Sequence, residues 1–272
     1  MKCKGWPIGV CSWSLQRDVA GVAEAMKKIG IEHVHLAVRA ALGTKGDDYL
    51  AAVQKQKWTI SGTMIDFPQE DYSTLESIKV TGGVGPDEYW EQNRLLFLGS
   101  AEVTVKLGVK YLSMHAGFID ESDAAYAKKF YERIRFLADA ASQRDIILLL
   151  ETGQETAQDL RHFLEELNHP AIGVNFDPAN MILYDKGNPI EAVQVLAPWI
   201  KHIHIKDAIR TTQPGTWGLE VPWGDGQVGP EIFLNALNQI GFEGTLAIER
   251  EAGNDRFADV KLAAERLSRV GR

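Results

Sequence analysis

At 272 residues with a formal net charge of −8, the chain is long enough for one closed α/β barrel or for two smaller domains. Nucleic-acid binding needs a basic surface, so the acidic charge argues against a nucleic-acid partner. Cys3 and Cys11 are too few for a disulfide framework. The opening MKCKGWPIGV does not resemble a signal peptide, and no run of roughly eighteen apolar residues predicts a membrane span. We therefore expect a soluble cytoplasmic protein without a membrane partner, and a homo-oligomer is left open.

Eight apolar segments of strand length recur along the chain. They are 8–14, 33–38, 59–67, 109–116, 146–152, 172–178, 200–207 and 245–251. Segments with helical spacing lie between them, among them 19–30, 126–142 and 259–270. Strands that alternate with helices predict a parallel sheet with helical crossovers, and near-continuous apolar strands such as IILLL fit a sheet buried on both faces.

The end of the first strand segment decides between two parallel folds. A doubly wound sheet usually carries a glycine-rich nucleotide loop there, but this segment runs into SWSLQRD. Because no linker divides the chain, the sequence predicts one domain over residues 1–272, a (β/α)₈ TIM barrel. Two long loops, 81–90 and 207–230, are expected at the mouth of its cavity, since loops that follow barrel strands form the active-site face.

Four successive strand segments end in residues that can bind a metal: Glu151, Asp177, His204 and Glu249. The carboxyl ends of barrel strands meet at one rim, so these side chains should converge. A shared cation would offset the cost of burying their charges, and the oxygen-rich set favours one Mn²⁺, with Mg²⁺, Zn²⁺ or Co²⁺ as alternatives. Each residue alone could be structural, and Asp177 before Pro178 could be a helix cap. The joint pattern favours the metal site.

On these strand-end residues the sequence resembles the xylose isomerase-like TIM barrels of the sugar phosphate isomerase and epimerase group. That group includes ketose 3-epimerases, hydroxypyruvate isomerase, inosose dehydratase and endonuclease IV. The resemblance to the epimerases implies a Glu–Asp–His–Glu metal set, in which Glu151 and Glu249 also act as catalytic residues from opposite faces of the sugar. One removes the proton next to the carbonyl, the metal stabilises the enediolate, and the other returns a proton. It thus implies a metal-dependent isomerase or epimerase of a keto sugar.

Six further residues are candidates for substrate binding. Arg210 lies six residues after His204, where the resemblance places a substrate-binding arginine, although a loop arginine could equally be solvated. His115 ends the fourth strand segment, and Lys206 has the same strand parity as His204 but could also lie at the surface. Trp13 could form an apolar wall for a sugar ring or belong to the core.

The other two candidates mark departures from the epimerases. Ala157 stands where they carry a glutamate, for which Glu155 could substitute, and Asn180 stands where they carry a histidine. Both changes concern substrate contacts and not the metal, so the sequence does not name the sugar.

Three rival functions remain open. A lyase or dehydratase on a 3-keto sugar or inosose would share the enediolate but lose a β-substituent from it. An endonuclease IV-type nuclease would need a multinuclear zinc cluster and more histidines at strand ends, and the acidic charge disfavours it. A non-catalytic barrel would not require all four ligands.

Overall fold

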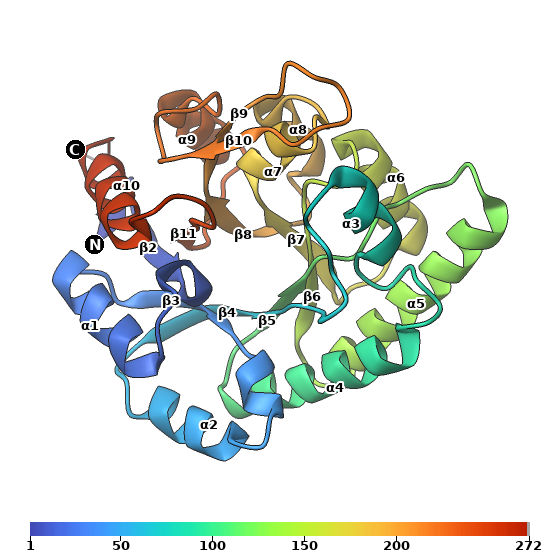
Figure 1. Cartoon of the computed structure of the whole chain (residues 1–272), viewed down its shortest axis with the longest axis horizontal. Coiled ribbons are helices and arrows are strands. Elements are labelled where there is room, and N and C mark those ends of the chain that lie inside the picture. Colours follow the sequence, from blue (N-terminus) through green and yellow to red (C-terminus); the bar gives the residue numbers. More distant parts are fainter. Residues whose placement is uncertain (271–272) are drawn as a thin grey trace.

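The computed structural model describes residues 1–270, and its centre is a closed barrel of eight parallel strands (Figure 1). In chain order these are β2 (Trp6–Cys11), β3 (His33–Ala37), β4 (Thr59–Ile65), β5 (Tyr111–Met114), β6 (Ile147–Glu151), β7 (Ile172–Phe176), β8 (Ile200–Ile205) and β11 (Leu246–Ile248). Strand β2 pairs with both β3 and β11, and these two parallel pairings close the barrel. The predicted TIM barrel is therefore confirmed, with one strand in each predicted segment.

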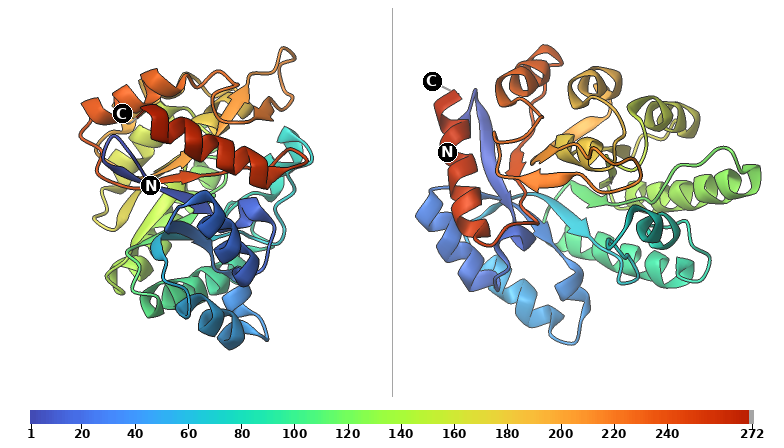
Figure 2. Two further views of the ribbon diagram at one scale, coloured as in Figure 1. Left: turned by 90° about the vertical axis from the view of Figure 1, so that its left-hand side faces the viewer. Right: turned by 45° about the horizontal axis from the view of Figure 1, so that its top comes forward.

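Eight helices surround the barrel, each following one strand (Figure 2). They are α1 (Val19–Ile29), α2 (Gly46–Gln54), α4 (Trp90–Lys106), α5 (Ala124–Ser142), α6 (Ala157–Leu167), α8 (Pro189–Leu196), α9 (Pro230–Gln239) and α10 (Arg256–Val270). The short strand β1 (Lys2–Cys3) pairs antiparallel with β2 and packs beside α10. Among the helices within residues 1–270, none combines the length and apolar character that crossing a bilayer would require.

Helix α1 shows how the local sequence sets one element of this wall. Asp18 caps its start by accepting the N–H of Gly21 at 2.8 Å, and Gly30 ends it in the left-handed conformation at φ 85°. Between them, Met26 and Ile29 fall on the buried face. Burying a side chain of this size contributes about 1.5–3 kcal/mol, which holds the helix against the barrel.

Smaller elements cover the carboxyl ends of the strands. They are the short helices η1 (Ser12–Leu15), η2 (Arg39–Leu42), α3 (Leu75–Thr81) and α7 (Pro178–Leu183), and the hairpin of β9 (Asp207–Ile209) and β10 (Leu219–Val221). In Figure 1, α3, α7 and the hairpin lie in front of the barrel. Several strands end before their predicted limits because the residues that follow already belong to these elements; residues 12–14, for example, belong to η1 and not to β2.

The loop of 207–230 is organised around one buried carboxylate. Asp207 Oδ1 accepts the N–H groups of Ala208 (2.9 Å) and Val228 (3.0 Å), and Oδ2 accepts those of Gly224 (2.9 Å) and Gly226 (3.1 Å). A Cβ on Gly226 would lie 2.2 Å from Oδ1, so only glycine fits there. The WGDGQVG stretch therefore folds as a nest of backbone donors around Asp207.

The two long loops contribute differently to the cavity. Residues 217–220 of the second loop line it, as expected. Residues of loop 81–90 are not among those that line the cavity. The loop instead supports a residue that does: the Gly83 N–H donates to Oε1 of Glu70 at 3.0 Å, and Glu70 lines the cavity.

We expect Asp207→Ala to lower the free energy of unfolding by about 3 kcal/mol, because four N–H groups, two of them on the buried residues Ala208 and Val228, would lose a charged acceptor. Chemical denaturation measures the loss, and amide hydrogen exchange should accelerate at Gly224 and Gly226. The matched control is Asp225→Ala in the same loop, whose half-exposed carboxylate pairs with Arg266 at 2.8 Å. An equal loss in both variants would show that Asp207 does not organise the loop.

Candidate metal centre and active site

Four side chains from successive barrel strands meet around the imidazole of His204. His204 lies in β8, Glu151 is the last residue of β6, and Asp177 and Glu249 directly follow β7 and β11. His204 Nδ1 lies 3.3 Å from Glu151 Oε1, 3.5 Å from Asp177 Oδ2 and 3.4 Å from Glu249 Oε2. One ligand atom from each residue lies within 4.8 Å of the others. The sequence-predicted set is thus brought together at one point.

The residues present fit a divalent cation. Within the described residues, Asp177 Oδ2 and His204 Nδ1 are buried and have no hydrogen-bond partner. Three buried carboxylates converge there, and the Lys206 ammonium pairs with two of them, Glu249 at 2.9 Å and Asp177 at 3.9 Å. Unpaired buried charge is costly, and carboxylate oxygens with one imidazole nitrogen suit Mg²⁺, Mn²⁺ or Zn²⁺.

Asp177 combines both roles that its position suggested. Its Oδ1 caps α7 by accepting the N–H of Asn180 at 2.8 Å, which leaves Oδ2 facing the other ligands. Burial raises the pKa of Asp177. A cation at the site would therefore compete with a proton for Oδ2.

The two glutamates are held in their ionised form. Burial alone would raise the pKa of Glu249, but the Lys206 ammonium and His204 hold it well below its usual value. Burial has the same tendency at Glu151, where His115 and His204 outweigh it and lower the pKa. Both carboxylates can therefore accept a proton.

Lys206 and Asn180 line the cavity and hydrogen-bond the two glutamates, Glu249 and Glu151. Lys206 Nζ donates to Glu249 Oε2 (2.9 Å), to Asn180 Oδ1 (3.2 Å) and to Glu251 Oε2 (2.6 Å). Asn180 Nδ2 donates to Glu151 Oε1 at 3.0 Å. One ammonium and one amide thus orient both glutamates, and Lys206 points inward, as its strand parity suggested.

Trp13 and His115 flank the same pair. The indole N–H of Trp13 donates to Glu249 Oε1 at 2.7 Å, so Trp13 orients a carboxylate as well as forming a wall. His115 Nε2 lies 3.8 Å from Glu151 Oε1. Burial would lower the pKa of His115, but Glu151 and Glu70 raise it overall, which makes its ring a proton donor close to the site.

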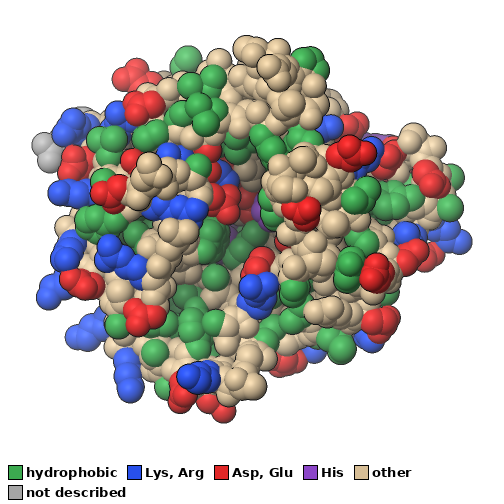
Figure 3. Space-filling model, viewed as in Figure 1, with side chains coloured by type: hydrophobic (Ala, Val, Ile, Leu, Met, Phe, Trp, Pro, Cys, Tyr) green, Lys and Arg blue, Asp and Glu red, His purple; other side chains and the backbone are tan. Residues whose placement is uncertain are grey.

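A cavity of about 1580 Å³ opens above these groups. Trp13, His115, Asn180, Lys206 and Glu249 all line it, while Glu151, Asp177 and His204 lie beneath its floor. Figure 3 shows the hollow near the middle of this face, with acidic side chains exposed inside it.

A profile of the xylose isomerase-like TIM barrel family matches residues 23–270. The chain belongs to this family. The crystal structure of a xylose isomerase domain protein from Planctomyces limnophilus is 30% identical, with a TM-score of 0.89 over 97% of each chain. Over 85 residues the chain is 31% identical to a 3-dehydroshikimate dehydratase of Bacillus anthracis, and this match spans 29% of the chain and 30% of that curated relative.

More distant structures of the same fold carry a metal or a named activity. A xylose isomerase-like TIM barrel protein from Mycobacterium smegmatis, solved in complex with magnesium, has 17% identity and a TM-score of 0.74 over 99% of this chain and 98% of that one. The 3-keto-D-glucoside 4-epimerase of E. coli has 13% identity and a TM-score of 0.74 over 97% and 99% of the two chains. At these identities the likeness shows the fold.

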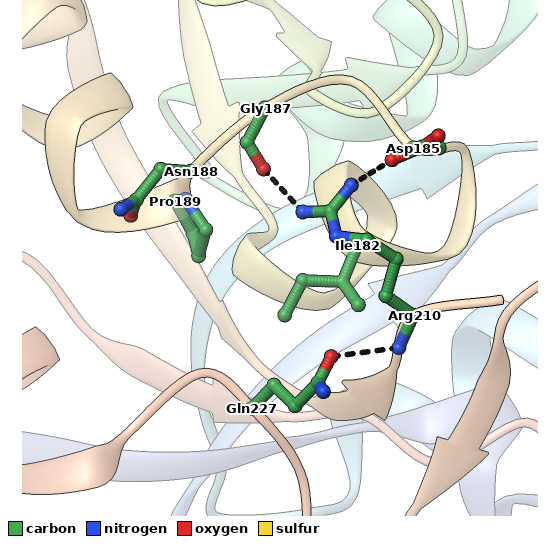
Figure 4. A pocket seen from close by; sticks show the side chains of 7 residues that line it. All are labelled: Ile182, Asp185, Gly187, Asn188, Pro189, Arg210 and Gln227. Carbon is green, nitrogen blue, oxygen red and sulfur yellow. Dashed lines mark hydrogen bonds and ion pairs between the residues drawn. The ribbon is translucent and has the colours of Figure 1, made fainter. Parts of the chain in front are cut away.

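Arg210 does not reach the cavity, contrary to its predicted place. It follows β9, where the hairpin leads away from the barrel axis, and lines a separate surface pocket (Figure 4). Its guanidinium pairs with Asp185 and donates to the carbonyl oxygen of Gly187 at 2.6 Å. The arginine therefore ties the hairpin to the turn after α7.

Glu155 is also displaced from its predicted role. It is only 7% exposed and does not line the cavity. Burial raises its pKa to about 8. Glu155 belongs to the loop between β6 and α6, and its buried carboxyl does not open into the cavity.

Reasoning from strand ends missed His35, which lies inside β3. Its Nδ1 is 2.9 Å from His204 Nε2, and burial, together with His204, lowers the pKa of His35 to about 3. If His204 Nδ1 binds a metal, its Nε2 carries the hydrogen and donates it to the neutral His35 ring. His202, two residues earlier in β8, is also buried and hydrogen-bonds Asn175 Oδ1 at 2.9 Å.

The contact between His35 and His204 predicts how substitutions change the affinity for a metal. Wild-type protein should bind about one divalent ion per chain, and His204→Ala should lose it. His35→Leu removes the acceptor that fixes the His204 tautomer and should weaken binding about 10-fold or more. Equilibrium dialysis with Zn²⁺ and Mn²⁺ measures both effects.

The matched control is His35→Asn, whose amide oxygen can stand in place of Nδ1. It should retain affinity within about threefold of wild type. If the leucine and asparagine variants lose affinity equally, His35 acts through packing alone.

Glu155 gives a prediction about pH. A carboxyl with a raised pKa binds its proton more tightly in the folded than in the unfolded chain. Its contribution to stability is therefore complete below the ordinary pKa of 4.5 and is lost as the pH rises to about 8. Glu155→Gln should remove this slope, so its stability relative to wild type should increase by on the order of 3 kcal/mol between pH 5 and pH 8. Denaturant titrations at both pH values test this; parallel pH profiles would contradict it.

Proposed function

We propose that the chain is a divalent-metal-dependent enzyme that transfers a proton at the carbon next to a carbonyl group in a keto sugar or sugar derivative, as an isomerase or epimerase. One observation carries this proposal. Two ionised glutamates, Glu151 and Glu249, lie within 3.4 Å of His204 Nδ1; Glu249 lines a large cavity and Glu151 lies beneath it. Two positioned carboxylates at one carbon can serve as general base and general acid.

The four-residue set would hold the metal, with Mn²⁺ as the proposed ion because three of the four ligands are carboxylates. A bound divalent cation supplies Lewis acidity, which makes the proton next to a carbonyl easier to remove. The magnesium complex of the Mycobacterium smegmatis relative supports a divalent ion in this fold.

The chain's own residues divide the remaining work. Glu249 is fixed at both oxygens, by Trp13 and by Lys206, so its carboxylate is oriented before the substrate arrives. Glu151 is fixed by Asn180, which lies in α7 after the neighbouring strand β7. In this arrangement one glutamate takes the proton from carbon and the other returns one, while His115 offers a hydrogen bond to a substrate oxygen and Lys206 holds Glu249 in place.

A dehydratase or lyase acting on a 3-keto sugar or inosose is the second candidate. The similarity to a 3-dehydroshikimate dehydratase over part of the chain favours it. So does His115, a proton donor 3.8 Å from Glu151. In that reaction a glutamate takes the proton from carbon, the bond from the β-carbon to its hydroxyl breaks, and His115 protonates the departing oxygen to give water.

Proton exchange in D₂O distinguishes these reactions. With Mn²⁺-loaded protein and a panel of ketoses, 3-keto sugars and inososes, NMR should show deuterium at the carbon next to the carbonyl. Inverted or shifted stereochemistry indicates the isomerase or epimerase, and an unsaturated product indicates the lyase. Glu249→Gln should slow exchange by about 100-fold or more, because an amide cannot act as a base.

Glu243→Gln, an exposed residue before β11, is the control and should exchange at the wild-type rate. Exchange at that rate by Glu249→Gln would limit Glu249 to a ligand and refute the two-glutamate mechanism.

A further inference from the structure

We infer that the cavity takes an uncharged substrate of two ring units, a glycoside or a disaccharide, and excludes a sugar phosphate. This substrate class rests on the proposed function, since it belongs to the same site. Three independent features of the cavity carry it: the backbone donors of its loops, its charges, and its size and aromatic walls.

The backbone donors that could bind a phosphate are already used by carboxylates of the chain. In TIM barrels, phosphate groups are frequently bound by the loops after the last two strands. Here Asp207 accepts four N–H groups in the loop after β8. In the loop after β11, Glu220 Oε1 accepts the N–H groups of Glu251 (3.0 Å) and Ala252 (3.3 Å). These backbone N–H groups already donate to the carboxylates of Asp207 and Glu220, so they are not available to a phosphate.

The charges that line the cavity also disfavour a phosphate group. Seven Asp or Glu residues line it against four Lys or Arg residues. Three of those cations are already engaged: Arg39 pairs with Asp66 at 2.9 Å, Lys206 is held by two glutamates, and Arg17 lies 5.3 Å from the ring centre of Phe257. Lys45 alone would then face a phosphate dianion in a cavity whose lining carries more carboxylates than cations.

The size of the cavity indicates more than one sugar ring. At about 1580 Å³ it exceeds the roughly 300–1,000 Å³ of most small-molecule sites. Its wall is aromatic beyond the metal ligands, where the rings of Tyr184 and Trp217 lie 4.6 Å apart and Tyr72 lies 5.9 Å from His115. Aromatic faces pack against the C–H faces of sugars and leave the hydroxyl groups to polar side chains. A second ring or an aglycone fits this outer region.

Isothermal titration calorimetry with trehalose, glucose and glucose 6-phosphate tests the inference on the metal-loaded protein. Trehalose should bind most tightly, and glucose 6-phosphate about 10-fold or more weakly than trehalose. Failure of trehalose to bind more tightly than both other sugars overturns the inference.

Two variants locate the cause. Trp217→Ala should weaken trehalose binding about fivefold and leave glucose unchanged, because only the second ring reaches the outer wall. Phe136→Ala, an exposed aromatic residue on α5, is its control and should change neither. Glu220→Gln keeps an acceptor but removes a charge, so it should raise the affinity for glucose 6-phosphate severalfold relative to that for trehalose. Equal effects of Trp217→Ala on both uncharged sugars would contradict the outer site.

Binding is independent of proton transfer, so the two proposals can fail separately. A protein that prefers trehalose but holds no metal and exchanges no proton would refute the proposed function alone. A protein that holds its metal and exchanges protons best with ketose phosphates would refute the substrate class alone.

Discussion

The arrangement of polar groups at the barrel mouth depends on three carboxylates, those of Glu151, Asp177 and Glu249, which are buried around the imidazole of His204. In a medium of low dielectric constant, each of these charges would cost several kcal/mol if it stood alone. The surrounding polar groups reduce that cost: Lys206, Trp13 and Asn180 each donate to a glutamate oxygen. Two ligand atoms nevertheless remain without hydrogen-bond partners within the described residues. Hydrogen bonding inside the chain thus compensates the buried groups only in part, and a cation would contact the two atoms that remain.

The local fold and the site depend on each other at Asp177. As a helix cap, it starts α7 and fixes the direction in which the chain leaves β7. That first turn brings Asn180 back over the barrel, where its amide bonds both Glu151 and Lys206. The cap therefore places a cavity-facing amide as well as a candidate metal ligand. A cap and a ligand were alternative interpretations of the sequence, but the two oxygens of one carboxylate serve both.

The sequence was sufficient for features that depend on local periodicity, and insufficient for those that depend on distant partners. Strand ends and strand parity predict the barrel, the four-residue set and the inward direction of Lys206, because a parallel barrel brings every carboxyl end to one rim. Arg210 was misplaced because its position depends on Asp185 and on a hairpin whose course no local pattern reveals. His35 escaped notice because a histidine in the middle of an apolar strand is typical of the core. Its importance comes from β8, 169 residues away.

Lys206 and Asp207 are adjacent residues directly after β8. Lys206 orients Glu249 at the site, and Asp207 organises the loop that covers it. His202, His204 and Lys206 share one parity and face the barrel interior, while Asp207 faces the opposite way, into the nest of backbone donors. Side chains alternate along a strand. The charges of Lys206 and Asp207 could therefore exchange places only if the register shifted by one residue, which would turn every side chain of the strand to the other face. The loop that Asp207 holds carries Trp217 and Glu220 to the cavity wall. The register of a single strand thus determines both which groups lie at the base of the cavity and which loop forms its wall.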